Sequence, residues 1–355
     1  MKKVASDDLK AGMVIGETVH SINGKQILFP KGGVLTNKVI DTIKNWDVPY
    51  VRIEEEADWP GSGAEEEQTL KLPLILQDKA KQFGNALQDS VAKVDTLLQQ
   101  TKQSKIVGMK NFHEVAAEIF AHLIYPPEAV HRLLFSLKKG SSLAYHSVMV
   151  GALSGMLAQW MNFDVKNTRE IILAGLLHDI GKTQLSSEQT DGLGTTGREG
   201  ETVQAHVLFA FKLLKDNRGI SPGVLAGVVQ HHEYMDGSGH PRQLSGEKIH
   251  VYARVIGVVN RLSNMIEATE TINPFLLLQI IKQQMFTKLD PEVCDVFSRR
   301  ISDYLLCSSV ILEDGRMAKV AFLPHVNPDF PVLQAEDEFI DMLANKEAKI
   351  VGLVV

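Results

Sequence analysis

The sequence holds few cysteines and no excess of basic residues, and these two shortages exclude several classes of protein. Cys294 and Cys307 are the only cysteines among 355 residues. They are too few for a disulfide framework, which favours a reducing compartment such as the cytoplasm. Both lie far from every histidine cluster in the sequence, so a thiolate metal site is excluded. Lysine and arginine number 37 against 43 aspartates and glutamates, a balance that argues against a DNA-binding protein.

Long apolar runs are also missing. The run from Ile171 to Leu177 is among the longest, and it is far shorter than the roughly 20 residues that a membrane-spanning helix needs. The charged residues that follow Met1 are not succeeded by an apolar segment, which excludes a signal peptide. The sequence therefore predicts a cytoplasmic protein with no membrane partner.

The distribution of residues along the chain predicts four segments. Residues 1–55 carry turn signals between short apolar stretches, which is typical of a small β-rich accessory domain. Residues 56–104 begin as an acidic, glycine-rich linker and continue as a connecting helix. Apolar residues recur at helical spacing through residues 105–305, and residues 306–355 contain a β-hairpin with its turn at Asp314-Gly315. The predicted fold class is mainly α, a helical bundle with a small N-terminal β-rich domain and a short C-terminal β segment.

Polar residues interrupt apolar helices at positions where apolar residues are expected. The apolar run from Ile171 to Leu177 continues directly into His178 and Asp179. Burying a carboxylate beside an imidazole is unfavourable unless something compensates, and a divalent metal ion is the simplest compensation. His146 and Asn260 lie on the apolar stripes of two other predicted helices, so we expect these polar side chains to meet in the interior.

More histidines follow farther along the chain. His206 stands alone, whereas His231 and His232 form a pair that is followed by Glu233 and by Gly237-Ser238-Gly239-His240-Pro241. The last stretch must turn tightly because a helix cannot continue through it. Imidazole and carboxylate groups together suit Fe, Mn, Ni or Zn.

Each of these residues also has an ordinary structural explanation. A single buried histidine such as His146 or His206 is more often a hydrogen-bonded core residue than a metal ligand. Asn260 by itself would be a polar residue that bends or bonds to its own helix. The combination of His178-Asp179, His231-His232 and the glycine-rich turn, in this order, favours a metal centre.

On these motifs the sequence resembles the HD-GYP family, a branch of the HD superfamily of metal-dependent phosphohydrolases. The resemblance covers about residues 105–305, and residues 1–55 are similar to a small domain that precedes some bacterial members. The matching residues are Tyr145-His146-Ser147, Leu177-His178-Asp179-Ile180-Gly181-Lys182, His206, His231-His232-Glu233, Gly237-Ser238-Gly239, Pro241 and Ile256 to Met265. The resemblance implies an HD-type helical bundle.

The resemblance further implies two divalent metal ions, of Fe, Mn, Ni or Zn. One ion would be held by His146, His178, Asp179 and Asn260. Asp179 would bridge to the second ion, whose other ligands would be His206, His231 and His232.

Family members hydrolyse cyclic di-GMP or related cyclic dinucleotides in bacterial second-messenger signalling, and the resemblance implies this phosphodiesterase activity here. The catalytic residues would be Asp179 and Lys182, with Lys182 stabilising charge on the phosphoryl oxygens. Water activated by the metal pair would attack phosphorus. The expected substrate contacts are Gly239, His240 and Pro241.

The sequence departs from the family pattern at several points. His240 replaces the tyrosine of the usual Gly-Tyr-Pro, and Asn260 replaces the usual aspartate ligand. Asparagine ligates through a neutral oxygen, so the first metal should bind more weakly. The arginine-rich segment expected just after Met265 is absent, and Ser142 falls near the position of a glutamate that adds a third metal in some relatives.

These departures leave other hypotheses open. The leading hypothesis is a phosphodiesterase for cyclic di-GMP or cyclic GMP-AMP. The second is a degenerate domain that binds a nucleotide or a signalling protein partner without hydrolysis. A third is a phosphohydrolase for linear nucleotides or phosphate esters. The sequence leaves the oligomeric state, including a homodimer, open.

Overall fold

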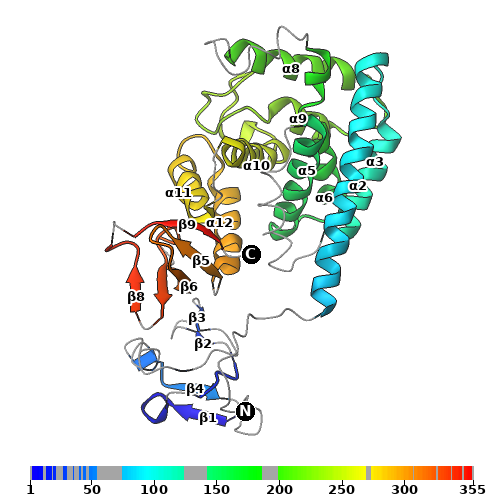
Figure 1. Cartoon of the computed structure of the whole chain (residues 1–355). Coiled ribbons are helices and arrows are strands. Elements are labelled where there is room, and N and C mark those ends of the chain that lie inside the picture. Colours follow the sequence, from blue (N-terminus) through cyan, green and yellow to red (C-terminus); the bar gives the residue numbers. More distant parts are fainter. Residues whose placement is uncertain are drawn as a thin grey trace. The chain divides into compact units, whose positions relative to one another are not determined.

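The computed structural model divides the chain into two compact units, residues 1–71 and residues 72–355 (Figure 1). Each unit is described by itself. The segment boundaries expected near residues 55, 104 and 305 stay predictions, and the expected acidic linker lies outside the described residues. The residues that the structure describes are 2–10, 13–17, 19–20, 27–29, 35, 40, 43–44, 48–53, 74–123, 142–185, 199–268, 273–306, 308–324, 327–336, 338–345 and 348–353.

The first unit is a small β-rich domain. Strands β1 (Lys2–Ala5) and β4 (Tyr50–Ile53) pair antiparallel, and the 3-10 helix η1 (Ser6–Asp8) follows β1. Strands β2 (Val19–His20) and β3 (Ile27–Phe29) form a second antiparallel pair. The β character expected from the turn signals is confirmed. The apolar core of this unit contains Leu9, Ile15, Val19, Leu35, Ile40, Ile43, Val48, Val51 and Ile53.

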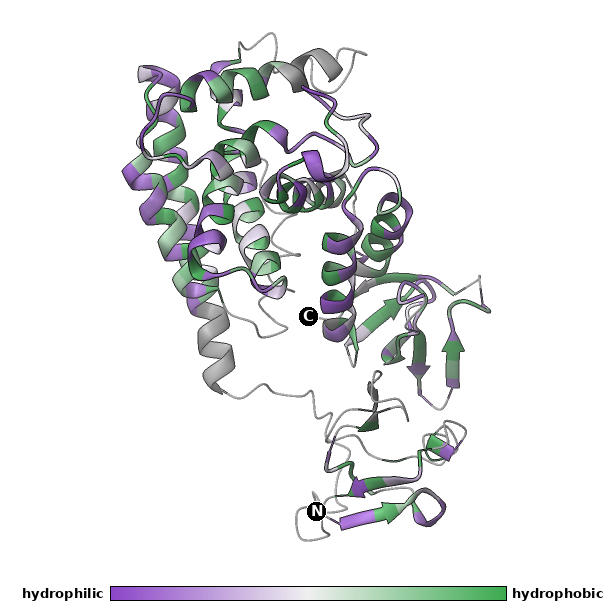
Figure 2. Ribbon diagram, turned by 180° about the vertical axis from the view of Figure 1, so that it is seen from behind, coloured by the Kyte–Doolittle hydropathy of each residue, from purple (hydrophilic) through white to green (hydrophobic). Residues whose placement is uncertain are grey.

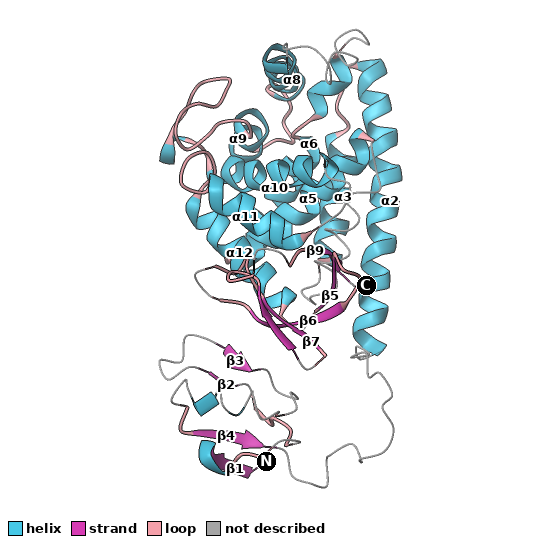
Figure 3. Ribbon diagram, turned by 60° about the vertical axis from the view of Figure 1, so that its left-hand side comes forward, coloured by secondary structure: helices cyan, strands magenta, loops and turns pink. Residues whose placement is uncertain are grey.

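The second unit is mainly helical, as expected (Figure 3). Among the described residues, none of its helices combines the length and apolar character needed to cross a bilayer. Its α-helices are α2 (Leu74–Ser104), α3 (Met109–His122), α5 (Leu143–Trp160), α6 (Val165–Leu177), α8 (Glu199–Leu214), α9 (Pro222–Gln230), α10 (Val251–Ala268), α11 (Pro274–Gln284) and α12 (Pro291–Leu305). The 3-10 helices are η3 (Ile180–Gln184) and η5 (Gly246–Lys248).

Helix α5 is the centre of the helical bundle. Every residue of α5 from His146 to Ala158 is buried, and α5 packs against α2, α6, α10 and α12. Such a helix has no solvated face, which explains why its sequence is apolar all round. Helices α5 and α6 approach closely because a Cβ atom on Gly175 would lie only 2.7 Å from the Cα atom of Gly151.

Capping side chains fix where three of these helices begin. Ser142, Asp164 and Ser221 each accept a hydrogen bond from the backbone N–H three residues farther on, at the starts of α5, α6 and α9. Pro222 then occupies the first turn of α9, where its missing N–H has no helical partner in any case. These caps fix the starts of α5, which carries His146 in its first turn, and of α6 and α9, which end at His178 and His231.

The chain closes with an antiparallel sheet of order β8-β7-β6-β5-β9. The expected hairpin forms between β5 and β6, with Ile311 opposite Met317, but the sheet is larger than this hairpin. Inward residues of the sheet belong to the same hydrophobic core as α11 and α12, and Figure 2 shows that its strands carry both apolar and polar residues. The strands are β5 (Ser309–Leu312), β6 (Met317–Phe322), β7 (Val332–Ala335), β8 (Glu338–Asp341) and β9 (Ile350–Leu353).

Candidate metal centre

Helix α6 ends inside the protein, at two polar residues. Residues 171–177 are all buried, so α6 passes through the core. His178 is the C-cap of this helix, and its Nδ1 atom lies 2.6 Å from the carbonyl oxygen of Gly175. Asp179 follows and is only 1% exposed. The hydrogen bond at Nδ1 fixes the ring so that Nε2 faces the interior.

Lys182 belongs to the next turn of the chain, the 3-10 helix η3. Its ammonium group donates a hydrogen bond to Oδ2 of Asp179 at 2.6 Å. The sequence predicts Lys182 on the same α-helical face as His178. Because the chain tightens into 3-10 geometry after Asp179, the ammonium group is bonded to the carboxylate of Asp179.

One group of donor atoms forms around the Oδ2 atom of Asp179. We call His146, His178, Asn260 and this oxygen the His146 group. The Nε2 atom of His146 lies 3.2 Å from His178 Nε2 and 3.1 Å from Asn260 Oδ1. His178 Nε2 is 3.2 Å from Asp179 Oδ2. On the other side of the ring, Ser263 Oγ lies 3.2 Å from His146 Nδ1 and orients it.

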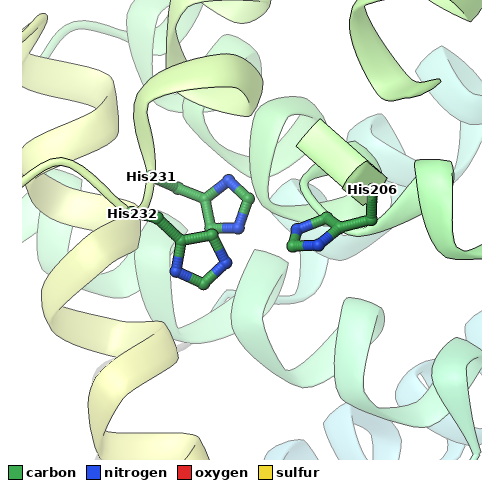
Figure 4. A group of neighbouring side chains, drawn as sticks. All are labelled: His206, His231 and His232. Carbon is green, nitrogen blue, oxygen red and sulfur yellow. The ribbon is translucent and has the colours of Figure 1, made fainter. Parts of the chain in front are cut away.

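A second group of donor atoms forms around the Oδ1 atom of Asp179. We call His206, His231, His232 and this oxygen the His206 group; Figure 4 shows its three imidazoles turned toward one another. His206 comes from α8, and His231 is the C-cap of α9, with Nδ1 held 2.7 Å from the carbonyl oxygen of Val228. His206 Nε2 lies 3.2 Å from Asp179 Oδ1. One donor atom from each histidine lies within 4.8 Å of the other two.

The His206 group has the character of a cation site. Among the described residues, His206 Nε2, His231 Nε2 and Asp179 Oδ1 are buried without a hydrogen-bond partner. Leaving such groups unsatisfied costs about 1–3 kcal/mol each, unless a ligand satisfies them. Nitrogen and carboxylate donors at this spacing fit a divalent transition metal.

The histidines of this group are held in the neutral form that binds metals. Burial lowers the pKa of His206 to about 4 and the pKa of His232 to about 2, and neighbouring imidazoles add to the effect. Burial also lowers the pKa of His231 well below its ordinary value. For Asp179, burial alone raises the pKa, but Lys182 and the adjacent histidines outweigh it and hold the pKa well below its usual range.

These shifts predict that the metal-free protein loses stability as the pH falls from about 6.5 to about 4. In the unfolded chain His206, His231 and His232 take up protons near their ordinary pKa of about 6.5, whereas the folded protein excludes them. The unfolded state therefore binds up to three more protons, and the free energy of unfolding falls by up to about 4 kcal/mol per pH unit.

Chemical denaturation of metal-stripped protein at a series of pH values between neutrality and pH 5 measures this slope. His231→Gln should reduce the slope by about one third, because one of three linked protons is lost. The same change at the exposed His113 is the matched control. Equal free energies of unfolding at the two ends of the series would contradict the prediction.

Gly181 allows α8 to approach the site. A Cβ atom on Gly181 would lie 1.8 Å from the carbonyl oxygen of His206 and 2.7 Å from the backbone nitrogen of Ala210. Both are backbone atoms, so no side chain can move aside. The absence of a side chain at Gly181 therefore lets His206 reach Asp179.

Gly181→Ala is expected to lower the free energy of unfolding by about 3 kcal/mol, since α8 must be displaced to admit the methyl group. The displacement also moves His206, so metal retention should fall. Gly84→Ala on α2 is the matched control, because nothing lies within 4 Å of a Cβ atom there. Denaturation curves of the two variants test this, and an unchanged midpoint for Gly181→Ala would contradict it.

The glycine-rich turn folds back onto His232. His240 donates its backbone N–H to the carbonyl oxygen of His232 at 3.1 Å, and the two imidazoles stack with centroids 4.8 Å apart. Gly237 has a φ of +80°, and a Cβ atom on Gly239 would lie 2.4 Å from the backbone nitrogen of Tyr234. The tight turn expected from the sequence is observed, and it brings His240 beside the His206 group.

Glu233, which the sequence analysis named in the His231-His232-Glu233 motif without assigning it a role, supports the glycine-rich turn. Its carboxylate is buried and accepts hydrogen bonds from the backbone N–H groups of Arg242, at 2.7 Å, and Leu244, at 2.9 Å. It therefore ties the far end of the glycine-rich turn to the residue after His232. The sequence feature that could have indicated this role is a carboxylate placed directly after the histidine pair His231-His232.

Other histidines make separate local contacts. His113 Nε2 lies 2.7 Å from the carbonyl oxygen of Gly219, and His122 Nδ1 lies 2.9 Å from that of Glu118. His250 packs edge-on against Tyr252. None of these three belongs to the His146 group or the His206 group.

Comparison with known proteins shows what the helical region is similar to. A sequence model of the HD domain family matches residues 124–293. The chain is 28% identical over 251 residues to the cyclic di-GMP phosphodiesterase PA4108 of Pseudomonas aeruginosa, covering 70% of this chain and 60% of that protein. It is 27% identical over 250 residues to a cyclic di-GMP phosphodiesterase of Thermotoga maritima, covering 65% of this chain and 64% of that protein. The match thus spans about three fifths of each relative.

Two further comparisons extend this result. The 3'3'-cGAMP-specific phosphodiesterase 3 of Vibrio cholerae is 28% identical over 166 residues, which cover 43% of this chain and 34% of that protein. Among solved structures, the HDG"Y"P protein Bd1817 of Bdellovibrio bacteriovorus superimposes with a TM-score of 0.52 at 14% identity, covering 84% of this chain and 98% of that chain. The structural likeness establishes a shared fold.

Proposed function

Because this chain is an HD-GYP domain protein, we propose that it is a metal-dependent phosphodiesterase that opens a cyclic dinucleotide by hydrolysis. Relatives named for cyclic di-GMP and for 3'3'-cGAMP support this substrate class. Such messengers serve bacterial signalling, which is the role we propose for this protein. The substrate itself is one of these two cyclic dinucleotides.

One observation carries the proposal: a single buried carboxylate lies between two groups of metal-type donors. Asp179 directs Oδ2 toward the His146 group and Oδ1 toward the His206 group. We propose that His146, His178, Asp179 and Asn260 hold one divalent ion. His206, His231 and His232, with Oδ1 of Asp179, would hold the second ion. Each ion would be Fe, Mn, Ni or Zn. Bound there, the ions would supply water activation near neutral pH and neutralise phosphoryl charge.

Other residues of the chain would stabilise charge and contact the substrate. Lys182 projects an ammonium group at Oδ2 of Asp179 and is about one third exposed, so it can reach both the centre and a ligand. Placed there, it would stabilise the charge that develops on the phosphoryl oxygens. We propose that Gly239, His240 and Pro241 contact the substrate, since the turn holds His240 against His232.

A second candidate function is a binding module that does not turn substrate over. It is favoured by Asn260, which lies 3.1 Å from His146 and brings no charge to the His146 group. Such a domain would bind a cyclic dinucleotide, or a signalling protein partner, and transmit its presence. A homodimer is compatible with either function.

Turnover of purified, metal-loaded protein distinguishes the two functions. The proposed phosphodiesterase should convert cyclic di-GMP or 3'3'-cGAMP to linear products that chromatography resolves. Binding of either nucleotide without any product would move the assignment to the binding module. Neither binding nor turnover would reject both, and a panel of linear nucleotides and phosphate esters would then be the next test.

We also propose a cytoplasmic location. It is supported by the low cysteine count and by the state of Cys294, a free, buried thiol. Burial raises the pKa of that thiol to about 12, which leaves it unreactive. Cys307 lies outside the described residues.

A further inference from the structure

The His146 group and the His206 group differ in how their donor atoms are satisfied. In the His206 group, His206 Nε2, His231 Nε2 and Asp179 Oδ1 are buried and form no hydrogen bond within the described part of the chain, although His206 Nε2 and Asp179 Oδ1 lie 3.2 Å apart. In the His146 group the donor atoms contact one another. His146 Nε2 is bonded to both His178 and Asn260. A cation entering the His206 group satisfies buried atoms that have no hydrogen bond, whereas a cation entering the His146 group must first break the hydrogen bonds of His146 Nε2.

The two groups also differ in available charge. Asp179 is the one carboxylate that they share, and its Oδ2 atom already accepts a hydrogen bond from Lys182. Asn260 contributes a neutral oxygen. The nearby carboxylate of Glu233 is occupied by the backbone N–H groups of Arg242 and Leu244. Two divalent ions would bring four positive charges, and the ammonium of Lys182 adds a fifth. Within the two groups, only the carboxylate of Asp179 offsets this charge.

A phosphoryl group supplies the missing negative charge. It is anionic, and its oxygens can coordinate divalent cations and accept hydrogen bonds from Lys182. We propose that this centre fills in two steps. One divalent cation is resident in the His206 group, and a second enters the His146 group together with the phosphoryl group of the ligand. This inference deepens the proposed function and rests on its metal centre.

Thermodynamic linkage makes the proposal quantitative. If phosphate tightens the second metal, the second metal must tighten phosphate by the same factor. We expect a factor of at least about ten, within the usual range of coupling between sites. If the second metal ion also tightens phosphate binding, the two ligands are coupled at one site. Phosphate that binds independently elsewhere on the protein would not show this effect.

The test counts the metal ions bound to the chain of 355 residues and requires no substrate turnover. Metal-stripped protein is dialysed against micromolar Mn²⁺, with and without millimolar inorganic phosphate, and bound manganese is measured by mass spectrometry. One Mn²⁺ per chain is expected without phosphate and two with it. Electron paramagnetic resonance should show an isolated Mn²⁺ signal in the first case and a spin-coupled pair in the second.

Asn260→Asp is the decisive variant, because it adds a charge and changes the side chain by a single atom. It should bind two Mn²⁺ ions without phosphate. His206→Asn and His146→Asn are a matched pair of variants, and they show which donor group binds the first ion and which binds the second. The first should lose the resident ion, whereas the second should keep it and lose the phosphate-dependent ion. Circular dichroism of each variant verifies folding.

The proposal is overturned if the wild-type chain binds two Mn²⁺ ions equally well without phosphate, or if phosphate leaves the count at one or none. It is also overturned if Asn260→Asp still needs phosphate for its second ion. Cyclic dinucleotides play no part in these measurements. A chain that fills in two steps but hydrolyses nothing would keep this inference and remove the proposed enzyme activity.

Discussion

Asp179→Asn is expected to lower the turnover of cyclic di-GMP or 3'3'-cGAMP by more than about a thousandfold, because bound metal ions contribute several kcal/mol to such reactions. The variant keeps the size of the side chain and removes the one charge that both donor groups share. It also removes the anionic partner of Lys182. The loss should therefore come with a loss of bound metal.

The measurement is steady-state turnover together with metal content per chain. Asp216→Asn is the matched control, since it removes the same charge from a side chain that is 86% exposed. The control should retain the wild-type rate and metal content. An Asp179→Asn protein that stays folded, keeps two metals and retains even a tenth of the wild-type rate would contradict the role assigned to this carboxylate.

Lys182→Met is expected to lower kcat by about a hundredfold to a thousandfold, the usual effect of removing one group that stabilises charge in the transition state. Methionine keeps the unbranched apolar stem of the side chain while removing its terminal charged group. In contrast with Asp179→Asn, this variant should retain its metal, because Lys182 donates to the carboxylate and supplies no lone pair.

Comparison with Lys215→Met separates this effect from a general change of charge, because Lys215 is an exposed lysine near the end of α8. That control should keep the wild-type kcat and KM. For Lys182→Met, a fall in kcat with metal content and thermal stability unchanged is the expected pattern. If its rate equals that of the control, Lys182 has no part in the reaction.

The sequence could predict the helical character of the fold and the ends of its helices at the site. The apolar run of residues 171–177 predicts a buried helix, and a polar pair at its end must then lie in the core. The same reasoning predicts that His146 and Asn260 point inward, because each interrupts an apolar stripe. The structure brings these side chains to within hydrogen-bonding distance of one another.

Other features depend on contacts that no local pattern encodes. The structure places Lys182 in a 3-10 turn after Asp179, whereas the sequence spacing fits an α-helix equally well. The close approach of Gly181 to His206 joins segments that are distant in the chain. Strands β7, β8 and β9 were not predicted, because each has only four residues and gains its stability from pairing with neighbours.

The positions of His178 and His231 as C-caps have an electrostatic consequence. Helices α6 and α9 both end at these residues, so two helix macrodipoles direct their negative ends at the same interior point. Each end is equivalent to roughly half an elementary charge. The C-terminal ends of the two helices together are equivalent to about one negative charge, similar to that of one more carboxylate. This charge comes from backbone carbonyl groups, which do not titrate. The two helix ends thereby favour binding of a cation first, and an anionic ligand is attracted only after that cation has reversed the local field.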